Sequence, residues 1–265
     1  MEVFIQYGNK MLNFTFMSIK YTFDSSFKEI DKHKFIDANN NDFDRLKEYF
    51  NNSGEMLIKY YIFSTREGKY KSDPFRSISR ASARWHVNSV YRYWEVDEDP
   101  HFPHELVHIF AHQLDKPYIW KTKLDTYNED TIEVDLPMVS TSFLQEGLAV
   151  ALDDIIFQRK IHENGKWEFL DKLVENINEW DLITTKILNF EGFSEVPNSV
   201  SIPFAGYLSK HIIKKYSFEK FKQLYIGIKE IHSTEENTKT FNNILKRSLD
   251  SIVEEVKSQF ISVRK

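Results

Sequence analysis

The residues most clearly suited to metal binding and catalysis are His104 and His108, with Glu105 directly after the first histidine. On an α-helix, residues four positions apart lie about 6 Å apart along the axis and about 40° apart around it, so both imidazoles can bind one metal ion. Glu105 projects about 100° from His104, where a carboxylate can reach a water on the ion without becoming a ligand. This spacing predicts a catalytic zinc site with Glu105 as general base.

The neighbouring residues favour a helix over 103–115. Pro103 stands near its first position, where a missing N–H costs nothing. His112 shares the arc that the histidine motif occupies, and the other side of the helix is apolar from Leu106 to Leu114. Such a helix places its chemistry in a cleft and its apolar side on the core. The competing interpretation is an ordinary amphipathic helix that carries histidines on its surface.

A catalytic zinc site needs a third protein ligand. The chain has no cysteine, so this ligand must be His, Asp or Glu. His112 lies about 12 Å along the axis from His104, too far to share an ion on one straight helix. Glu146 is favoured because it is a charged residue inside an apolar helix predicted over 141–158, where a carboxylate needs a cation or strong donors. Gly147 would let this helix approach the first one closely.

The two segments HELVH, from residue 104, and QEGLA, from residue 145, together resemble the gluzincin metallopeptidases, the thermolysin-like clan. The resemblance implies a zincin-like fold, a Zn²⁺ cofactor and the hydrolysis of peptide bonds by metal-activated water. It also implies that His104, His108 and Glu146 are the metal ligands and that Glu105 is the base. The similarity extends over roughly residues 55–262 and is weaker in the C-terminal part.

Two further roles concern residues around the metal. The gluzincin resemblance implies a Tyr or His in the C-terminal half that stabilises the oxyanion, and Tyr207 and His211 are the candidates. A tyrosine usually found a few residues before an Ala-Gly pair is missing here, and a core aromatic is the competing interpretation of Tyr207. A metal-bound imidazole usually donates its other N–H to a carboxylate or carbonyl. Asp153, two turns after Glu146, is the predicted acceptor, with Asp154 as the alternative; both could instead cap the helix or face solvent.

The order of strands and helices predicts an α+β fold, with a small N-terminal sheet, an edge strand over the active-site helix and a mostly helical C-terminal part. The edge strand, expected within 83–94, would run beside the cleft. We expect three segments: 1–55, an N-terminal strand and helix of unclear assignment; 56–158, a zincin-like catalytic core; and 159–265, a helical subdomain. Strands are expected within 13–23 and 56–65, a helix over 41–52, a turn-rich stretch over 66–75, a surface loop over 116–140, and helices over 165–179, 181–190, 203–216, 218–231 and 239–262.

Composition and charge limit the classes of partner that the protein is expected to bind. The 265 residues carry a net charge of −5 with no concentrated basic stripe, so we expect no nucleic acid. No stretch approaches the ~18 apolar residues of a membrane span, and the uncharged run 11–19 is interpreted as a strand rather than a signal peptide, which predicts a cytoplasmic protein. A peptide or protein substrate is expected, and the oligomeric state is not predicted. The alternatives are a hydrolase of a non-peptide bond, an aminopeptidase, a non-catalytic or regulatory metal-binding protein, and a helical protein without metal.

Overall fold

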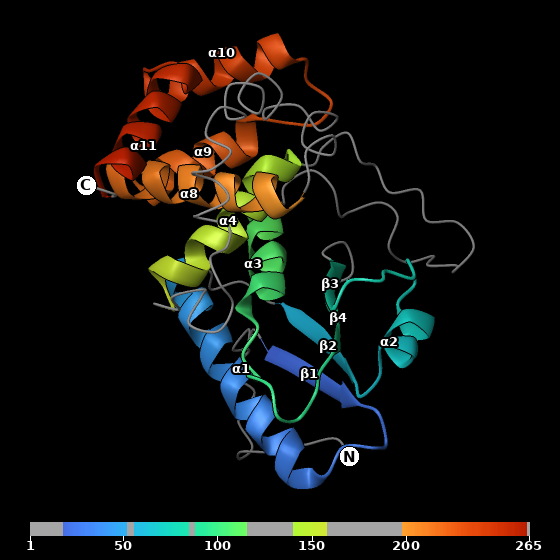
Figure 1. Ribbon diagram of the computed structural model, residues 1–265. Coiled ribbons are helices and arrows are strands. Elements are labelled where there is room, and N and C mark those ends of the chain that lie inside the picture. Colours follow the sequence, from blue (N-terminus) through green and yellow to red (C-terminus); the bar gives the residue numbers. More distant parts are fainter. Residues whose placement is uncertain (1–17, 52–55, 85–87, 116–139, 158–197, 264–265) are drawn as a thin grey trace, which may run out of the picture.

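The computed structural model describes residues 18–51, 56–84, 88–115, 140–157 and 198–263. The fold is α+β, as predicted: a small sheet lies at one end, the C-terminal helices lie at the other, and two helices run between them (Figure 1). Among the described helices, none has the length and apolar character that crossing a membrane requires.

The sheet has four strands in the order β1-β2-β4-β3. The strands β1 (Ser18–Phe23), β2 (Leu57–Phe63) and β4 (Ser89–Tyr93) are parallel, and β3 (Ala81–Arg84) pairs with β4 in antiparallel orientation. Parallel neighbours need a crossover connection, and helix α1 (Glu29–Tyr49) provides it between β1 and β2. Because β1 is hydrogen-bonded to β2, the 1–55 segment contributes a strand to the same sheet as the 56–158 segment.

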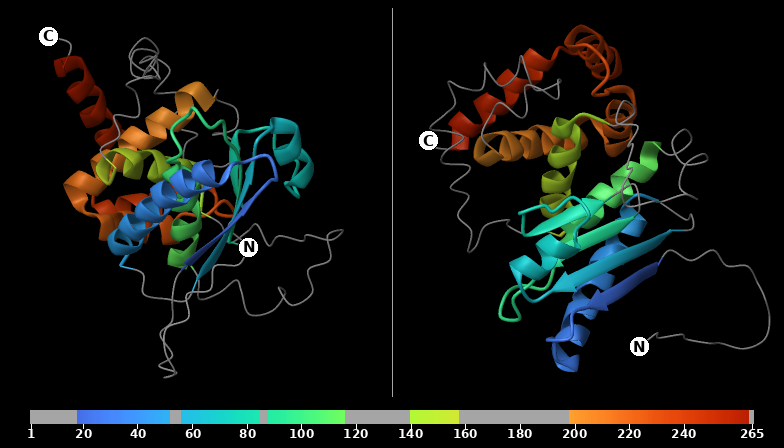
Figure 2. Two further views of the ribbon diagram at one scale, coloured as in Figure 1. Left: turned by 90° about the horizontal axis from the view of Figure 1, so that it is seen from below. Right: turned by 90° about the vertical axis from the view of Figure 1, so that its right-hand side faces the viewer.

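One face of the sheet packs against the hydrophobic core. Ile58, Tyr60 and Ile62 alternate along β2 and are fully buried, as expected for a strand with one covered face. The ring of Phe35, from α1, lies 5.4 Å from the Tyr60 ring and 5.0 Å from the Trp94 ring. Helix α2 (Arg66–Ser72) lies on the side of the sheet away from α1 (Figure 2).

Two predictions in the N-terminal half were wrong in their boundaries. Helix α1 begins at Glu29 rather than at residue 41. The prediction missed this start because two buried positions of the helix, Asn39 and Asp42, are polar and interrupt the apolar period that marks a helix. The turn-rich stretch over 66–75 contains helix α2. Its N-cap, Thr65, accepts a hydrogen bond from the Gly68 N–H, a local capping signal that the apolar pattern does not reveal.

The helices between the two ends are α3 (Pro103–His112), followed by the short 3₁₀ helix Gln113–Asp115, and α4 (Ser142–Ile155). Helix α4 packs along α8 (Asn198–Tyr216). Two glycines make this approach possible. A Cβ on Gly147 would lie 2.7 Å from the Ala205 carbonyl oxygen, and one on Gly206 would lie 2.3 Å from Cγ1 of Val150.

The C-terminal helices also depart from their predicted limits. Helix α8 begins at Asn198 rather than 203, since Pro203 lies inside the helix and does not start it. Helix α9 is Phe218–Gly227. The single helix predicted over 239–262 is two helices, because Lys246 adopts the left-handed conformation that ends a helix. These two helices are α10 (Thr234–Leu245) and α11 (Leu249–Val263). The helices expected over 165–179 and 181–190, the loop over 116–139 and the strand residues 13–17 lie outside the described residues.

Candidate metal centre

Helix α3 holds His104 and His108 on successive turns. The centroids of the two rings lie 4.8 Å apart with an interplanar angle of 83°, and the two Nε2 atoms are 3.2 Å apart. Leu106, Val107 and Phe110 occupy the opposite side of the helix and are fully buried. The amphipathic pattern therefore fixes the rotation of α3 and directs both imidazoles away from the core.

Glu146, on α4, completes a group of three. Its Oε2 lies 3.3 Å from Nε2 of His104, and its Oε1 lies 3.6 Å from Nε2 of His108. Two ligand atoms that each lie about 2.1 Å from one ion at a tetrahedral angle are about 3.4 Å apart. The mutual distances of 3.2, 3.3 and 3.6 Å fit this requirement. In the described part of the chain, His104, His108 and Glu146 are the residues grouped so that they could hold a metal ion.

The charges of these three side chains are strongly linked. Burial would raise the pKa of Glu146, but the His108 and His104 rings oppose it and lower that pKa to about 2. Burial would lower the pKa of His104, but its hydrogen bond to Glu146 and the charge of that carboxylate raise it to about 9. Burial and the charge of His104 lower the pKa of His108. Without a metal, His104 therefore holds a proton against Glu146, and an ion that binds there must displace it.

Glu105 follows His104 on α3 and is 9% exposed. Its carboxylate makes no hydrogen bond within the described part of the chain, and it attracts the charge of Lys69 on α2. Glu105 lies outside the ligand group, and its role as general base stays a prediction.

Asp153 and Asp154 have different surroundings. Asp153 is half-buried, and burial raises its pKa to about 7 although the nearby charge of His104 opposes the shift. Its Oδ1 is buried and has no hydrogen-bond partner among the described residues. Asp154 instead forms an ion pair with Lys210. Of the two candidates for the carboxylate that orients His104, the electrostatic link to this ligand belongs to Asp153.

Tyr207 and His211 have their described contacts elsewhere. Burial and the charge of Asp154 raise the pKa of Tyr207 to about 12, and the Lys210 ammonium lies 5.9 Å from its ring centroid. Nε2 of His211 lies 3.4 Å from a carboxylate oxygen of Glu255 on α11. None of these contacts involves a metal ligand or Glu105, so the role of these two residues in binding an oxyanion stays a prediction.

Several residues that position α3 escaped sequence reasoning. The side chains of Asn39 and Arg92 donate hydrogen bonds to the Pro100 carbonyl oxygen, at 2.9 and 2.7 Å. Asp42 lies 3.0 Å from Nδ1 of His101. These contacts fix the chain just before the helix that carries the motif. Polar residues at helical spacing, Asn39 and Asp42, were the signal that could have revealed them.

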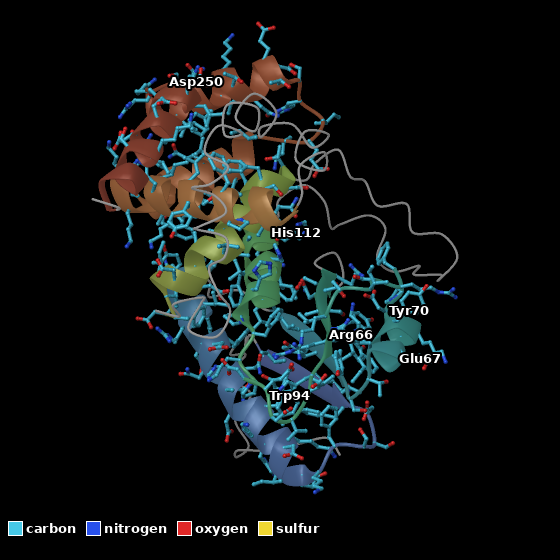
Figure 3. All side chains as sticks on the ribbon, in the orientation of Figure 1. Arg66, Glu67, Tyr70, Trp94, His112 and Asp250 are labelled. Atoms are coloured by element: carbon cyan, nitrogen blue, oxygen red, sulfur yellow. The ribbon has the colours of Figure 1, made fainter. Side chains whose placement is uncertain are left out.

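His112 is the last residue of the motif helix α3. It is 5% exposed and lies near the C-terminal end of α3, toward the helical part of the molecule (Figure 3). It is not part of the ligand group, in agreement with the argument that His112 is too far along the axis to bind the same ion as His104.

Comparison of the chain with protein families, characterised proteins and solved structures finds no match. Its function therefore has to be inferred from the chemistry of the site.

Proposed function

We propose that the protein is a zinc-dependent peptidase of the gluzincin type. The observation that carries this proposal is the convergence of His104, His108 and Glu146 at the distances that one tetrahedral ion requires. Two nitrogen ligands and one carboxylate are a donor set typical of catalytic zinc, which leaves a fourth position open. Such an ion would supply Lewis acidity toward a water and a scissile carbonyl.

The chain's own residues would then divide the work. His104, His108 and Glu146 would hold the ion, and Asp153, whose charge interacts with that of His104, is the candidate to orient the His104 ring. The Glu105 carboxylate accepts a proton from the attacking water and passes it to the leaving amine. Asn39 and Arg92 keep the start of α3 in place, so that both histidines hold their direction while the proton moves.

A peptide substrate is favoured by the edge of the sheet. Strand β3 has a single neighbour, β4, in the part of the chain that the structure describes, and β3 packs against α3. An extended peptide could pair through its backbone with the side of β3 away from β4. The antiparallel edge strand beside the motif helix, and the carboxylate supplied by a second helix, are the arrangement that a zincin-like fold leads us to expect.

A second candidate is a metal-binding protein without catalysis. It is favoured because the contacts of Tyr207 with Asp154 and of His211 with Glu255 involve no metal ligand, so neither side chain is established as the oxyanion donor. A missing donor of this kind costs a hydrolase about 10²–10³ in kcat, which would leave metal binding intact.

Three variants test the proposal. We expect the purified wild type to contain one zinc per chain and to cleave members of a peptide library. Glu105→Gln should keep the metal and lose activity, His108→Ala should lose both, and Asp154→Asn, next to the proposed orienting carboxylate, should change neither. Hydrolysis by Glu105→Gln at the wild-type rate would exclude this mechanism, and zinc binding without cleavage of any peptide would favour the non-catalytic candidate.

A further inference from the structure

The segment 66–84 has a charge opposite to that of the whole protein. It contains six Lys or Arg residues and only two Asp or Glu residues, a net charge of +4 in a chain whose total is −5. The segment forms α2, the connection after it and β3. Figure 3 labels Arg66, Glu67 and Tyr70 on α2, on the side of the molecule away from the C-terminal helices.

Large apolar side chains are exposed on the same segment. Ile78 is 88% exposed, Phe75 is 46% exposed and Tyr70 is 39% exposed. Isolated exposed apolar residues are common, but a group of them inside one short charged segment marks an interaction site. The Arg84 guanidinium lies 4.6 Å from the centroid of the Phe75 ring, so a basic and an apolar group of the segment meet there.

Not all of the positive charge is neutralised within the protein. Arg76 is exposed and has no ion pair among the described residues, and Arg66 lies over the face of the Tyr93 ring. Arg80, in contrast, forms an ion pair with Glu98. Lys71 pairs with Glu67, but both side chains are more than two-thirds exposed, so this pair contributes little and can be exchanged for another partner.

A buried carboxylate makes the surface rigid. Asp73 accepts hydrogen bonds from the Lys69 ammonium at 3.1 Å and from the Ser82 hydroxyl at 2.7 Å. The Arg84 guanidinium donates to both of its oxygens, at 2.7 and 2.6 Å. These bonds join the end of α2 to β3 across the connection. A surface held in this way loses little conformational entropy when a partner binds.

We propose that residues 66–84 are a docking surface for an acidic, apolar-containing stretch of an extended polypeptide, which would continue along β3 on the side away from β4. The basic side chains would attract the acidic residues of the partner, and Ile78 and Phe75 would cover its apolar ones. This inference rests on the proposed function for the role of the polypeptide as a substrate. The binding itself requires no catalysis.

A polypeptide is favoured over a nucleic acid, the other common polyanion. The surface is continuous with a strand edge, which a peptide backbone can pair with and a nucleic acid cannot. Its most exposed side chain, Ile78, is aliphatic and cannot stack on a base, whereas Phe75 and Tyr70 on the same surface could, so an oligonucleotide is included as a probe.

Fluorescence anisotropy with the full-length Glu105→Gln protein separates docking from cleavage. The probes are a labelled twelve-residue peptide of alternating Glu and Leu, the same peptide with Lys in place of Glu, and a labelled oligo-dT. We expect the acidic peptide to bind at least about tenfold more tightly than the basic one at low salt, and to weaken as salt is added. Ile78→Asp and Arg76→Glu should each weaken this binding by about tenfold. The matched controls Ile231→Asp and Lys239→Glu, at exposed positions of the α9–α10 connection and α10, should not.

Equal binding of the acidic and basic peptides would overturn the proposal. It would also fall if oligo-dT binds as tightly as the acidic peptide and Ile78→Asp leaves both affinities unchanged, since the surface would then be a general polyanion site. Binding of the acidic peptide by Glu105→Gln, without cleavage by the wild type, would support docking and reject the peptidase. Cleavage of both peptides with equal KM would support the peptidase and reject the docking surface.

Discussion

Replacing Gly147 by alanine should weaken both the fold and the metal site. The added Cβ would lie 2.3 Å from Oγ of Ser209 and 2.7 Å from the carbonyl oxygen of Ala205. The Ser209 hydroxyl can rotate, but the Ala205 oxygen belongs to the backbone of α8. Ordinary van der Waals contact begins at about 3.4 Å, so α4 and α8 must separate locally by about 0.7 Å.

Two opposing effects set the size of the stability change. Overpacking of this kind costs about 1–3 kcal/mol, and the clash with a backbone atom places it toward the upper end. Alanine offsets about 1 kcal/mol of this cost because its helix propensity exceeds that of glycine. We expect the free energy of unfolding to fall by about 2 kcal/mol, which lowers Tm by about 4–8 °C for a chain of this size.

The metal site should be more sensitive than the fold. Ligand distances must hold to within about 0.2 Å, and Gly147 directly follows the ligand Glu146, so a shift of several tenths of an ångström should reduce zinc affinity by about tenfold or more. Thermal unfolding and competition with a zinc chelator measure the two effects. Gly227→Ala is the control, because its Cβ would meet side-chain methyl groups, of Thr240 at 3.0 Å and of Ile244 at 3.7 Å, rather than backbone atoms. A Gly147→Ala protein with wild-type Tm and zinc affinity would refute the close packing of α4 on α8 as the support of Glu146.

Three other predictions concern the site. Because Glu146 raises the pKa of His104 to about 9 and a ligand imidazole must be neutral, the apparent zinc affinity should rise about tenfold per pH unit from pH 7 to 9; chelator competition giving a flat profile would contradict this. Asp153→Asn should lower zinc affinity by about 10–100-fold while Asp154→Asn leaves it unchanged in the same titration. Tyr207→Phe should change kcat/KM by less than about threefold. A loss of 10² or more at unchanged Tm would instead assign oxyanion stabilisation to the Tyr207 hydroxyl.

The geometry of the ligand group could be predicted because most of it is local. The separation of His104 and His108 on one helix follows from the period of the α-helix alone. The apolar residues between and after them determine which side of the helix faces the core. Glu146 was found by a different argument, since a carboxylate in an apolar helix needs a cation. This argument does not require the two helices to be neighbours in sequence.

The residues that sequence reasoning placed least well depend on how helices meet. Gly206 faces α4, where its close contact with Val150 fixes the rotation of α8. Tyr207, one residue later, is turned by about 100° and lies beside Asp154. The sequence contains both glycines, but a glycine in a helix does not reveal which neighbour it approaches. The direction of α8 could therefore not be predicted from its own residues.

The basic segment 66–84 was not recognised from the sequence for another reason. Its charges are spread over a helix, a connection and a strand, and a whole-chain charge of −5 conceals them. Asp73 joins these three pieces through Lys69 and Arg84, so the positive groups become one surface only in the folded chain. The same network places the cation Lys69 where it attracts Glu105. Loss of the Asp73 carboxylate should therefore disrupt the proposed docking surface, because Lys69 and Arg84 would lose the group that joins α2 to β3.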